Sequence, residues 1–167
     1  MYNTSMEQHA QHLKTVFKAL RQERLFLKKS KCAFGVSQIE YLGHIISKNG
    51  VCTDPKKLDA IAKWFILSTL RQLRGFLGLA GYYKKFINGF GIIAKPLTTL
   101  LKKDRFRWDS EAQQAFEKLK VALVNAPVLR LLDYSKDFVV ETDACGDGIG
   151  AVLMQDKHPV AYLSKAL

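Results

Sequence analysis

The sequence predicts an α+β fold, in which strands lie toward both ends of the chain and helices fill the middle. Residues 6–24 carry apolar side chains at helical spacing and lead into extended segments that reach residue 53. Residues 54–124 contain a succession of amphipathic helices. Residues 137–166 contain three strand candidates separated by turn sequences, which is typical of an antiparallel meander.

The first part of the chain is predicted to form a helix, two strands and a turn. The helix covers 6–24, and residues 25–34 look extended. A strand rich in β-branched and aromatic residues is expected over 38–47. Lys48-Asn49-Gly50 is a turn signal, after which residues 51–53 return as a short strand.

The middle of the chain is predicted to be helical, with recognisable start signals. Asp54-Pro55 places an N-cap residue before a proline at the first helical position. Ser68 is expected to cap a second helix that runs to about Ile87. Further helices are expected over 91–103 and over 111–124, the latter capped by Asp109 or Ser110.

Three glycines interrupt the second of these helices at intervals of three residues: Gly75, Gly78 and Gly81. A glycine inside a helix costs about 1 kcal/mol relative to alanine. Their repetition indicates that another backbone approaches the helix closely. From the pattern alone, tight packing against a neighbouring helix is the preferred explanation, and approach by a ligand is the alternative.

Charge is distributed unevenly along this chain, whose formal net charge is +11. Residues 1–136 hold 24 Lys and Arg against 10 Asp and Glu, a net charge of +14, whereas residues 137–167 hold 2 against 5, a net charge of −3. An excess of basic residues favours a polyanionic partner such as nucleic acid, and a solvated basic surface is the alternative. Three cysteines without a C-x-x-C pair argue against a disulfide framework or a structural zinc site.

A carboxylate in the middle of the first C-terminal strand candidate is the strongest sign of chemistry. Asp143 follows Val139 and Val140, and burying it is costly unless it is paired or binds a metal. Aspartate is a natural magnesium ligand, although an exposed position at a strand end is equally compatible with the pattern. Glu141 lies two residues away, and therefore on the same face of a regular strand.

Four consecutive motifs carry a resemblance to a known family. They are RLFLKKSKCAFGVSQIEYLGHIIS (24–47), STLRQLRGFLGLAGYYKKFINGFGIIAKPLTTLLKK (68–103), RWDSEAQQAFEKLKVALVNAPVL (107–129) and the C-terminal FVVETDACGDGIGAVLMQ with HPVAYLSKAL. In this order they resemble the reverse transcriptase and ribonuclease H region of gypsy-type LTR retrotransposon pol polyproteins. The resemblance covers nearly the whole chain, so the chain is expected to be an internal fragment of such a polyprotein.

The resemblance implies a division of the chain and a pair of activities. Residues 1–53 would be the end of the polymerase palm, 54–104 the thumb, and 105–167 a linking helix with a truncated ribonuclease H-like domain. The intact family enzymes are RNA-directed DNA polymerases and endonucleases that cleave RNA–DNA hybrids, and they use magnesium. The implied partner is an RNA–DNA hybrid or template–primer duplex. No membrane is expected, and the oligomeric state stays open.

The family also implies site residues. Tyr41-Leu42-Gly43-His44 resembles the primer grip, the hairpin that sets the primer 3′ end. The thumb helix would lie in the minor groove of the duplex, and basic residues near it would meet phosphates. The implied nucleic-acid-binding residues are Gly43, His44, Arg71, Arg74, Gly75, Gly78, Leu79, Lys84 and Lys85. Asp143 matches the first catalytic, metal-binding aspartate of ribonuclease H.

Departures from the family pattern lead us to expect no catalysis by the chain alone. The polymerase Tyr-x-Asp-Asp motif is expected just before Met1, and no Asp-Asp pair occurs in the sequence. Asp143 is the only ribonuclease H carboxylate present, so stable magnesium binding is not expected. Phe65 and Leu67 stand where the family usually has a Trp-Pro-x-Pro-like run. The alternative function is a domesticated or residual nucleic-acid-binding module without catalysis. For either function the compartment stays unknown, and an intracellular location is expected because the sequence shows neither a secretory signal nor a transmembrane segment.

Overall fold

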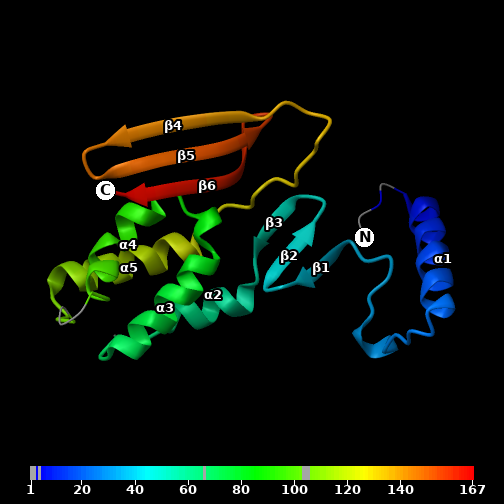
Figure 1. Cartoon of the computed structure of the whole chain (residues 1–167), viewed down its shortest axis with the longest axis horizontal. Helices are drawn as coiled ribbons and strands as arrows, with labels where there is room; N and C mark the ends of the chain where they lie inside the picture. Colours follow the sequence, from blue (N-terminus) through cyan, green and yellow to red (C-terminus); the bar gives the residue numbers. More distant parts are fainter. Residues whose placement is uncertain (1–2, 4, 66, 103–105) are drawn as a thin grey trace. The chain divides into compact units, whose positions relative to one another are not determined.

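The chain forms two compact units, which divide between Ile39 and Glu40 (Figure 1). The computed structural model describes residue 3 and residues 5–65, 67–102 and 106–167. The end of the predicted helix over 91–103 lies outside the described residues. The expected boundary between residues 104 and 105 lies outside them as well.

The first unit consists of helix α1 (Met6–Gln22), a 3₁₀ turn η1 (Lys29–Lys31) and irregular chain. Helix α1 begins as predicted, because the Ser5 hydroxyl accepts a hydrogen bond from the Gln8 amide at 3.2 Å. The extended conformation expected over 25–34 is wrong, since the 3₁₀ turn interrupts it.

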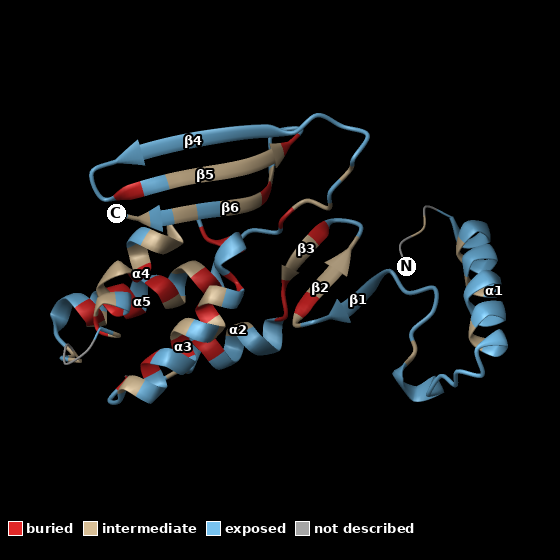
Figure 2. Cartoon of the chain, in the orientation of Figure 1, coloured by how far each residue is buried: buried red, intermediate tan, exposed pale blue. Residues whose placement is uncertain are grey.

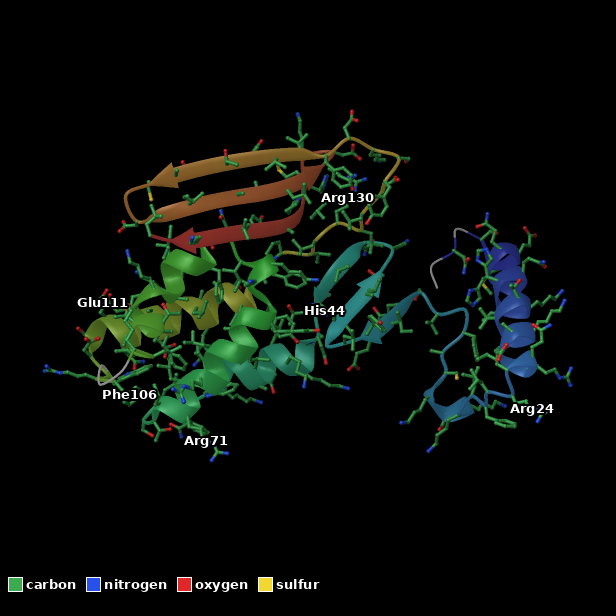
Figure 3. The ribbon with its side chains drawn as sticks, in the orientation of Figure 1. Arg24, His44, Arg71, Phe106, Glu111 and Arg130 are labelled. Atoms are coloured by element: carbon green, nitrogen blue, oxygen red, sulfur yellow. The ribbon has the colours of Figure 1, made fainter. Side chains whose placement is uncertain are left out.

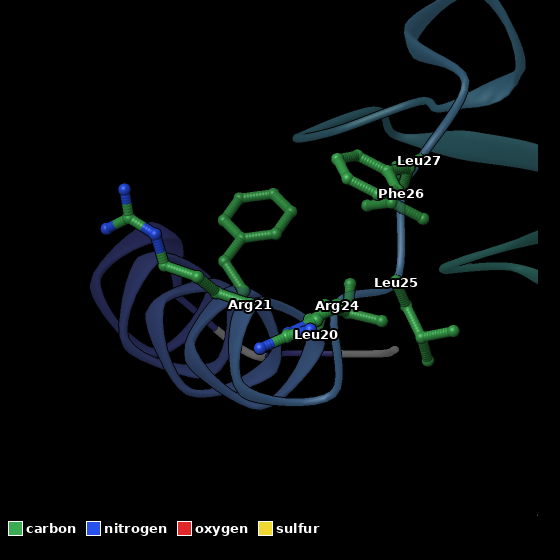
Figure 4. Close-up of a pocket in the computed structure, with 7 residues that line it drawn as sticks. Leu20, Arg21, Arg24, Leu25, Phe26 and Leu27 are labelled. Carbon is green, nitrogen blue, oxygen red and sulfur yellow. The ribbon is translucent and has the colours of Figure 1, made fainter.

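An open hollow of about 550 Å³ lies at the C-terminal end of α1 (Figure 4). It is lined by Phe17, Leu20, Arg21, Arg24, Leu25, Phe26 and Leu27. None of the described α1 residues is buried. The apolar side of this helix is therefore largely open to solvent within the first unit.

The first sheet has the order β1-β2-β3 and consists of β1 (Gln38–Tyr41), β2 (His44–Ser47) and β3 (Gly50–Thr53). Strands β2 and β3 pair antiparallel, as the turn signal predicted. The single strand expected over 38–47 is wrong, because Leu42 and Gly43 adopt left-handed φ angles of 48° and 72°. These two residues turn the chain and divide the segment into two strands.

Four helices of the second unit follow this sheet. They are α2 (Pro55–Ala62), α3 (Leu70–Tyr82), α4 (Phe90–Thr99) and α5 (Ser110–Val124), with a 3₁₀ turn η2 (Lys84–Phe86) between α3 and α4. Asp54 and Asp109 cap α2 and α5 as predicted. The cap of α3 is Thr69 rather than Ser68, because Thr69 and Gln72 form a reciprocal capping box.

The hydrophobic core lies where these helices meet, and Figure 2 shows the buried residues on their facing sides. Phe76 of α3 and Phe116 of α5 are fully buried, and their ring centroids are 4.7 Å apart. Trp64 and Trp108 pack edge-on against these two rings. None of the helices in the described ranges is long and apolar enough to cross a bilayer.

The second sheet is the antiparallel meander that the sequence predicted. It consists of β4 (Val139–Cys145), β5 (Gly148–Gln155) and β6 (His158–Ala166), in that order. Strand β6 lies along α4 (Figure 1), where the Gly91 amide donates to the Ser164 hydroxyl at 2.7 Å. The sheet is thereby attached to the helical core through one edge strand.

The segment after α5 joins the two sheets. The amide and carbonyl of Val51 exchange hydrogen bonds with those of Leu129, at 2.7 and 2.8 Å. The next amide, that of Arg130, donates to the carbonyl of Pro159 at 2.8 Å. Gly50 permits this approach: its φ is +130°, and an added Cβ would lie 2.1 Å from the Leu129 carbonyl oxygen.

The loop before β4 closes around the fully buried side chain of Gln155. This amide donates to the carbonyls of Asp133 and Lys136 and accepts from the Asp133 amide. Asp156 forms ion pairs with Lys136 at 2.7 Å and with Arg130, labelled in Figure 3, at 2.9 Å. The hydrogen bond from Lys136 lowers the pKa of Asp156, and hydrogen bonds from Ser135 lower the pKa of Asp133.

Candidate nucleic-acid interface

Helix α3 has one buried face and one exposed face. Leu73, Phe76 and Ala80 point into the core. Arg71, Arg74, Gly75 and Gly78 are exposed and share the opposite side of the helix at spacings of three and four residues. Arg71 extends away from the helix in Figure 3. We call these four residues the exposed face of α3.

The glycines of α3 are not explained by packing within the protein. A Cβ added at Gly75, Gly78 or Gly81 would meet nothing within 4 Å. The explanation by tight packing against a neighbouring helix is therefore wrong for the part of the chain that the structure describes. The remaining explanation is that the helix backbone is left open on this side for a ligand to approach.

The interface is basic. Within the described ranges, neither Arg71 nor Arg74 forms an ion pair with a carboxylate. Lys84 and Lys85 are exposed on η2, directly after α3, and the Lys85 ammonium lies 5.2 Å from the centroid of the Phe86 ring. Positive charge therefore lies on the exposed face itself and on the 3₁₀ turn that follows α3.

The β1–β2 turn meets the C-terminal end of α3. The Tyr82 hydroxyl donates to the carbonyl of Leu42 at 2.7 Å, and the Tyr83 hydroxyl donates to the carbonyl of Gly43 at 3.1 Å. Tyr41 and Leu42 are exposed, at 59% and 68% of their surface. The apolar tip of the turn thus lies beside the end of the exposed face.

His44, by contrast, is buried, with 8% of its surface exposed. Its Nδ1 lies 2.9 Å from the Leu42 carbonyl, which requires the proton on Nδ1. Its ring lies between 5.4 and 5.5 Å, centroid to centroid, from the rings of Tyr82, Tyr83 and Phe86. This side chain, labelled in Figure 3, holds the turn from inside.

Two of the predicted site residues depend on neighbours for their position. Leu79 is half-buried and packs against the hydrophobic core. Gly43 has a left-handed φ, and an added Cβ would lie 2.8 Å from the Tyr83 hydroxyl oxygen.

Sequence reasoning missed Tyr82 and Tyr83, although two adjacent tyrosines at a helix end were the available signal.

Asp143 lies on β4, a strand whose seven residues are all exposed. It pairs with Gly150, which pairs with Ser164, so Asp143 shares the sheet face that meets α4. Glu141 lies on the same face, as its spacing predicted. Among the described residues, no three His, Cys, Asp or Glu side chains gather to hold a metal. These residues alone do not fit the carboxylate cluster of a two-metal centre.

The chain is similar in sequence to known proteins over nearly its whole length. Residues 108–167 match the RNase H-like domain found in reverse transcriptase. The whole chain is 40% identical to the Retrovirus-related Pol polyprotein from transposon 297 of Drosophila melanogaster, and 98% of it is 38% identical to the Transposon Tf2-3 polyprotein of Schizosaccharomyces pombe. The chain belongs to the reverse transcriptase and ribonuclease H region of retrotransposon Pol polyproteins. It spans 16% and 13% of these two relatives.

Solved structures share the fold. The foamy viral protease-reverse transcriptase dRH in complex with ds DNA matches 99% of the chain with a TM-score of 0.91 and 25% identity. The foamy viral protease-reverse transcriptase in complex with RNA/DNA hybrid matches all of it with a TM-score of 0.89 and 25% identity. The chain covers 30% and 24% of these proteins, respectively. The α+β arrangement is therefore that of a reverse transcriptase region.

Proposed function

We propose that this chain binds a nucleic-acid duplex, an RNA–DNA hybrid or template–primer, as part of a reverse transcriptase with ribonuclease H. In this proposal residues 1–53 are the end of the palm, 54–104 the thumb, and 105–167 the linking helix and start of the ribonuclease H-like domain. The observation that carries the proposal is the exposed face of α3, where arginines flank glycines that have no neighbour of their own. Complexes of the foamy viral neighbours with ds DNA and RNA/DNA hybrid support it.

The chemistry of the exposed face suits a minor groove. An A-like hybrid has a wide and shallow minor groove, which proteins read by shape. Gly75 and Gly78 let the helix backbone approach the sugars, while Arg71 and Arg74 extend toward the phosphates on either side. Lys84 and Lys85 add phosphate contacts beyond the helix end. Binding of this kind releases counterions and falls steeply with salt.

The remaining predicted residues act around this face. Leu42 and Gly43 present the tip of the turn to the duplex. His44 and Leu79 act from behind, because the first is buried and the second packs against the core. Their contribution is to hold the contacting backbone in place.

For the ribonuclease H-like domain, we propose that Asp143 is the first metal-binding carboxylate and that the chain alone does not cleave hybrids. Two-metal cleavage requires several carboxylates around paired cations. Asp143 and Glu141 share a face, and the described residues add no third ligand to them. Incubating the chain with a labelled RNA–DNA hybrid and magnesium tests this. Cleavage that disappears in Asp143→Asn would contradict the proposal.

Duplex binding is tested by titrating a fluorescent hybrid with the chain at several salt concentrations. Arg74→Gln should reduce the slope of log K against log salt by about 0.9, as expected for one lost phosphate contact. Lys118→Gln removes an equal charge from the exposed side of α5 and is the matched control. The proposal fails if both variants lower affinity equally, or if no duplex binds at low salt.

The glycines provide an independent test. Gly78→Leu should raise the stability of α3, because leucine has a higher helix propensity, and should weaken duplex binding because its side chain occupies the open face. Opposite signs for stability and binding separate an interface role from a folding role. If Gly78→Leu binds the duplex as tightly as the unmodified chain, the glycines are not part of the interface.

A domesticated binding module without catalysis is the second candidate. The continuous core of α2 to α5 favours it, because such a core supports independent folding. This candidate requires two results: the chain must unfold cooperatively, and its affinity for a duplex must fall as the salt concentration rises.

A further inference from the structure

Four hydrogen bonds hold the two carbonyls of the Leu42–Gly43 turn. The Leu42 carbonyl accepts from the Tyr82 hydroxyl at 2.7 Å and from Nδ1 of His44 at 2.9 Å. The Gly43 carbonyl accepts from the Tyr83 hydroxyl and from the Asp54 amide, both at 3.1 Å. A carbonyl oxygen has two lone pairs, so both acceptors are fully used.

The two tyrosines reach the turn from different sides. Tyr83 is 1% exposed and lies in the core, whereas Tyr82 is 50% exposed. Their rings pack edge to face, with centroids 5.0 Å apart. Burial, followed by the influence of Tyr82 and Asp54, raises the pKa of Tyr83 and keeps its hydroxyl a hydrogen-bond donor. The turn is therefore hydrogen-bonded by one hydroxyl at the surface, that of Tyr82, and by one in the core, that of Tyr83.

The turn conformation needs such support. Leu42 has a φ of 48°, a region that bulky residues rarely occupy, and such a backbone conformation persists only where the surrounding structure imposes it. Leu42 also exposes 68% of its surface, so core packing does not fix it. The hydrogen bonds to the Leu42 and Gly43 carbonyls therefore hold Leu42 in its left-handed conformation.

Tyr82 also belongs to the helix side of the interface. It follows Gly78 by four residues, so it continues the exposed face of α3 to the end of the helix. One side chain thus touches both parts of the interface proposed above. A shift of the turn relative to α3 would have to break the Tyr82 hydrogen bond.

We propose that Tyr82 and Tyr83 are positioning residues that fix the Leu42–Gly43 turn to the C-terminal end of α3, so that turn and helix engage one duplex as a single surface. This inference rests on the proposed function. It assigns the tyrosines no contact with the reacting atoms. They act through the backbone of the turn, and the duplex contacts themselves belong to the turn and to the exposed face.

The test uses the full chain and the variants Tyr82→Phe, Tyr83→Phe and the double variant, which keep the rings and remove only hydroxyls. Tyr134→Phe is the matched control, because Tyr134 is 84% exposed and lies in a loop. Amide exchange of residues 41–44 should rise about fivefold in each single variant, the factor for one ordinary net hydrogen bond. Exchange in α5 and β5 should stay unchanged.

Affinity for a fluorescent RNA–DNA hybrid is measured on the same proteins. We expect a loss of about fivefold per hydroxyl, with an unchanged salt slope because no phosphate contact is removed. Faster exchange throughout the chain would mean a purely structural role and would overturn the inference. A looser turn with unchanged affinity would overturn it too. If the unmodified chain binds no duplex, the proposed function itself has failed.

Discussion

Gly50 offers the sharpest test of how the two sheets are joined. Replacing it with alanine places a Cβ 2.1 Å from the carbonyl oxygen of Leu129, and that atom belongs to the backbone. The φ of +130° at this position is also one that alanine avoids. The substitution must therefore move either β3 or the segment that pairs with it.

The size of the effect follows from the contacts that would be lost. The two hydrogen bonds between Val51 and Leu129 contribute about 1 kcal/mol each. Backbone strain at an unfavourable φ adds about 1–3 kcal/mol. We expect Gly50→Ala to lower the free energy of unfolding by about 4 kcal/mol, a large part of the roughly 5–15 kcal/mol typical of domains.

Urea unfolding followed by tryptophan fluorescence measures this change, because Trp64 and Trp108 both pack against the core. Gly146→Ala is the matched control: Gly146 has no neighbour within 4 Å and no positive φ. Its variant should stay within about 0.5 kcal/mol of the unmodified chain.

The reasoning would be refuted by a Gly50→Ala variant whose stability lies within about 1 kcal/mol of the original while the Leu129 amide stays protected from exchange. That outcome would mean that the bridge tolerates a side chain at this position, and that the close approach does not depend on glycine.

Three further predictions concern other parts of the second unit. Gln155→Leu should lower the free energy of unfolding by about 2–3 kcal/mol in urea titrations, since it leaves the half-buried Asp133 backbone amide and carbonyl without their partner; an unchanged midpoint would contradict this. Because the pKa values of Asp133 and Asp156 are lowered in the folded chain, their stabilisation is present above about pH 4 and is lost as the pH falls through the folded pKa. Asp156→Asn should flatten this part of a pH titration of stability. Gly78→Ala should raise the midpoint of thermal unfolding by the equivalent of about 1 kcal/mol, and a decrease would indicate a hidden contact at the exposed face.

Sequence patterns predicted the helices and the meander where local chemistry decides the structure. Asp54-Pro55 marks the start of α2 because the Asp54 carboxylate caps the helix. Proline suits the first helical position, since a backbone amide there would have no hydrogen-bond partner within the helix. The same reasoning predicted Ser68 as the cap of α3, but the cap is Thr69, because the Gln72 side chain forms the reciprocal hydrogen bond with the Thr69 backbone amide. Adjacent hydroxyl residues are equivalent in sequence, and only the reciprocal bond separates them.

Long-range contacts explain what the patterns missed. The segment over 38–47 looks like one strand because leucine gives no turn signal, yet tertiary hydrogen bonds hold Leu42 in a left-handed conformation. For the site, the family pattern selected His44 as a contact residue, whereas aromatic rings from α3 and η2 enclose it. The pattern of glycines was visible in sequence, but only the structure shows that their surroundings are open.

The acidic residues of β4 have a consequence for association between copies of the chain. This strand has a hydrogen-bonded neighbour on one side only among the described residues, which leaves its other edge able to recruit a strand. Two copies aligned antiparallel about Thr142 would bring Glu141 of one opposite Asp143 of the other. Facing carboxylates repel each other at neutral pH, so the charges that suit a cation also discourage this edge from seeding aggregates.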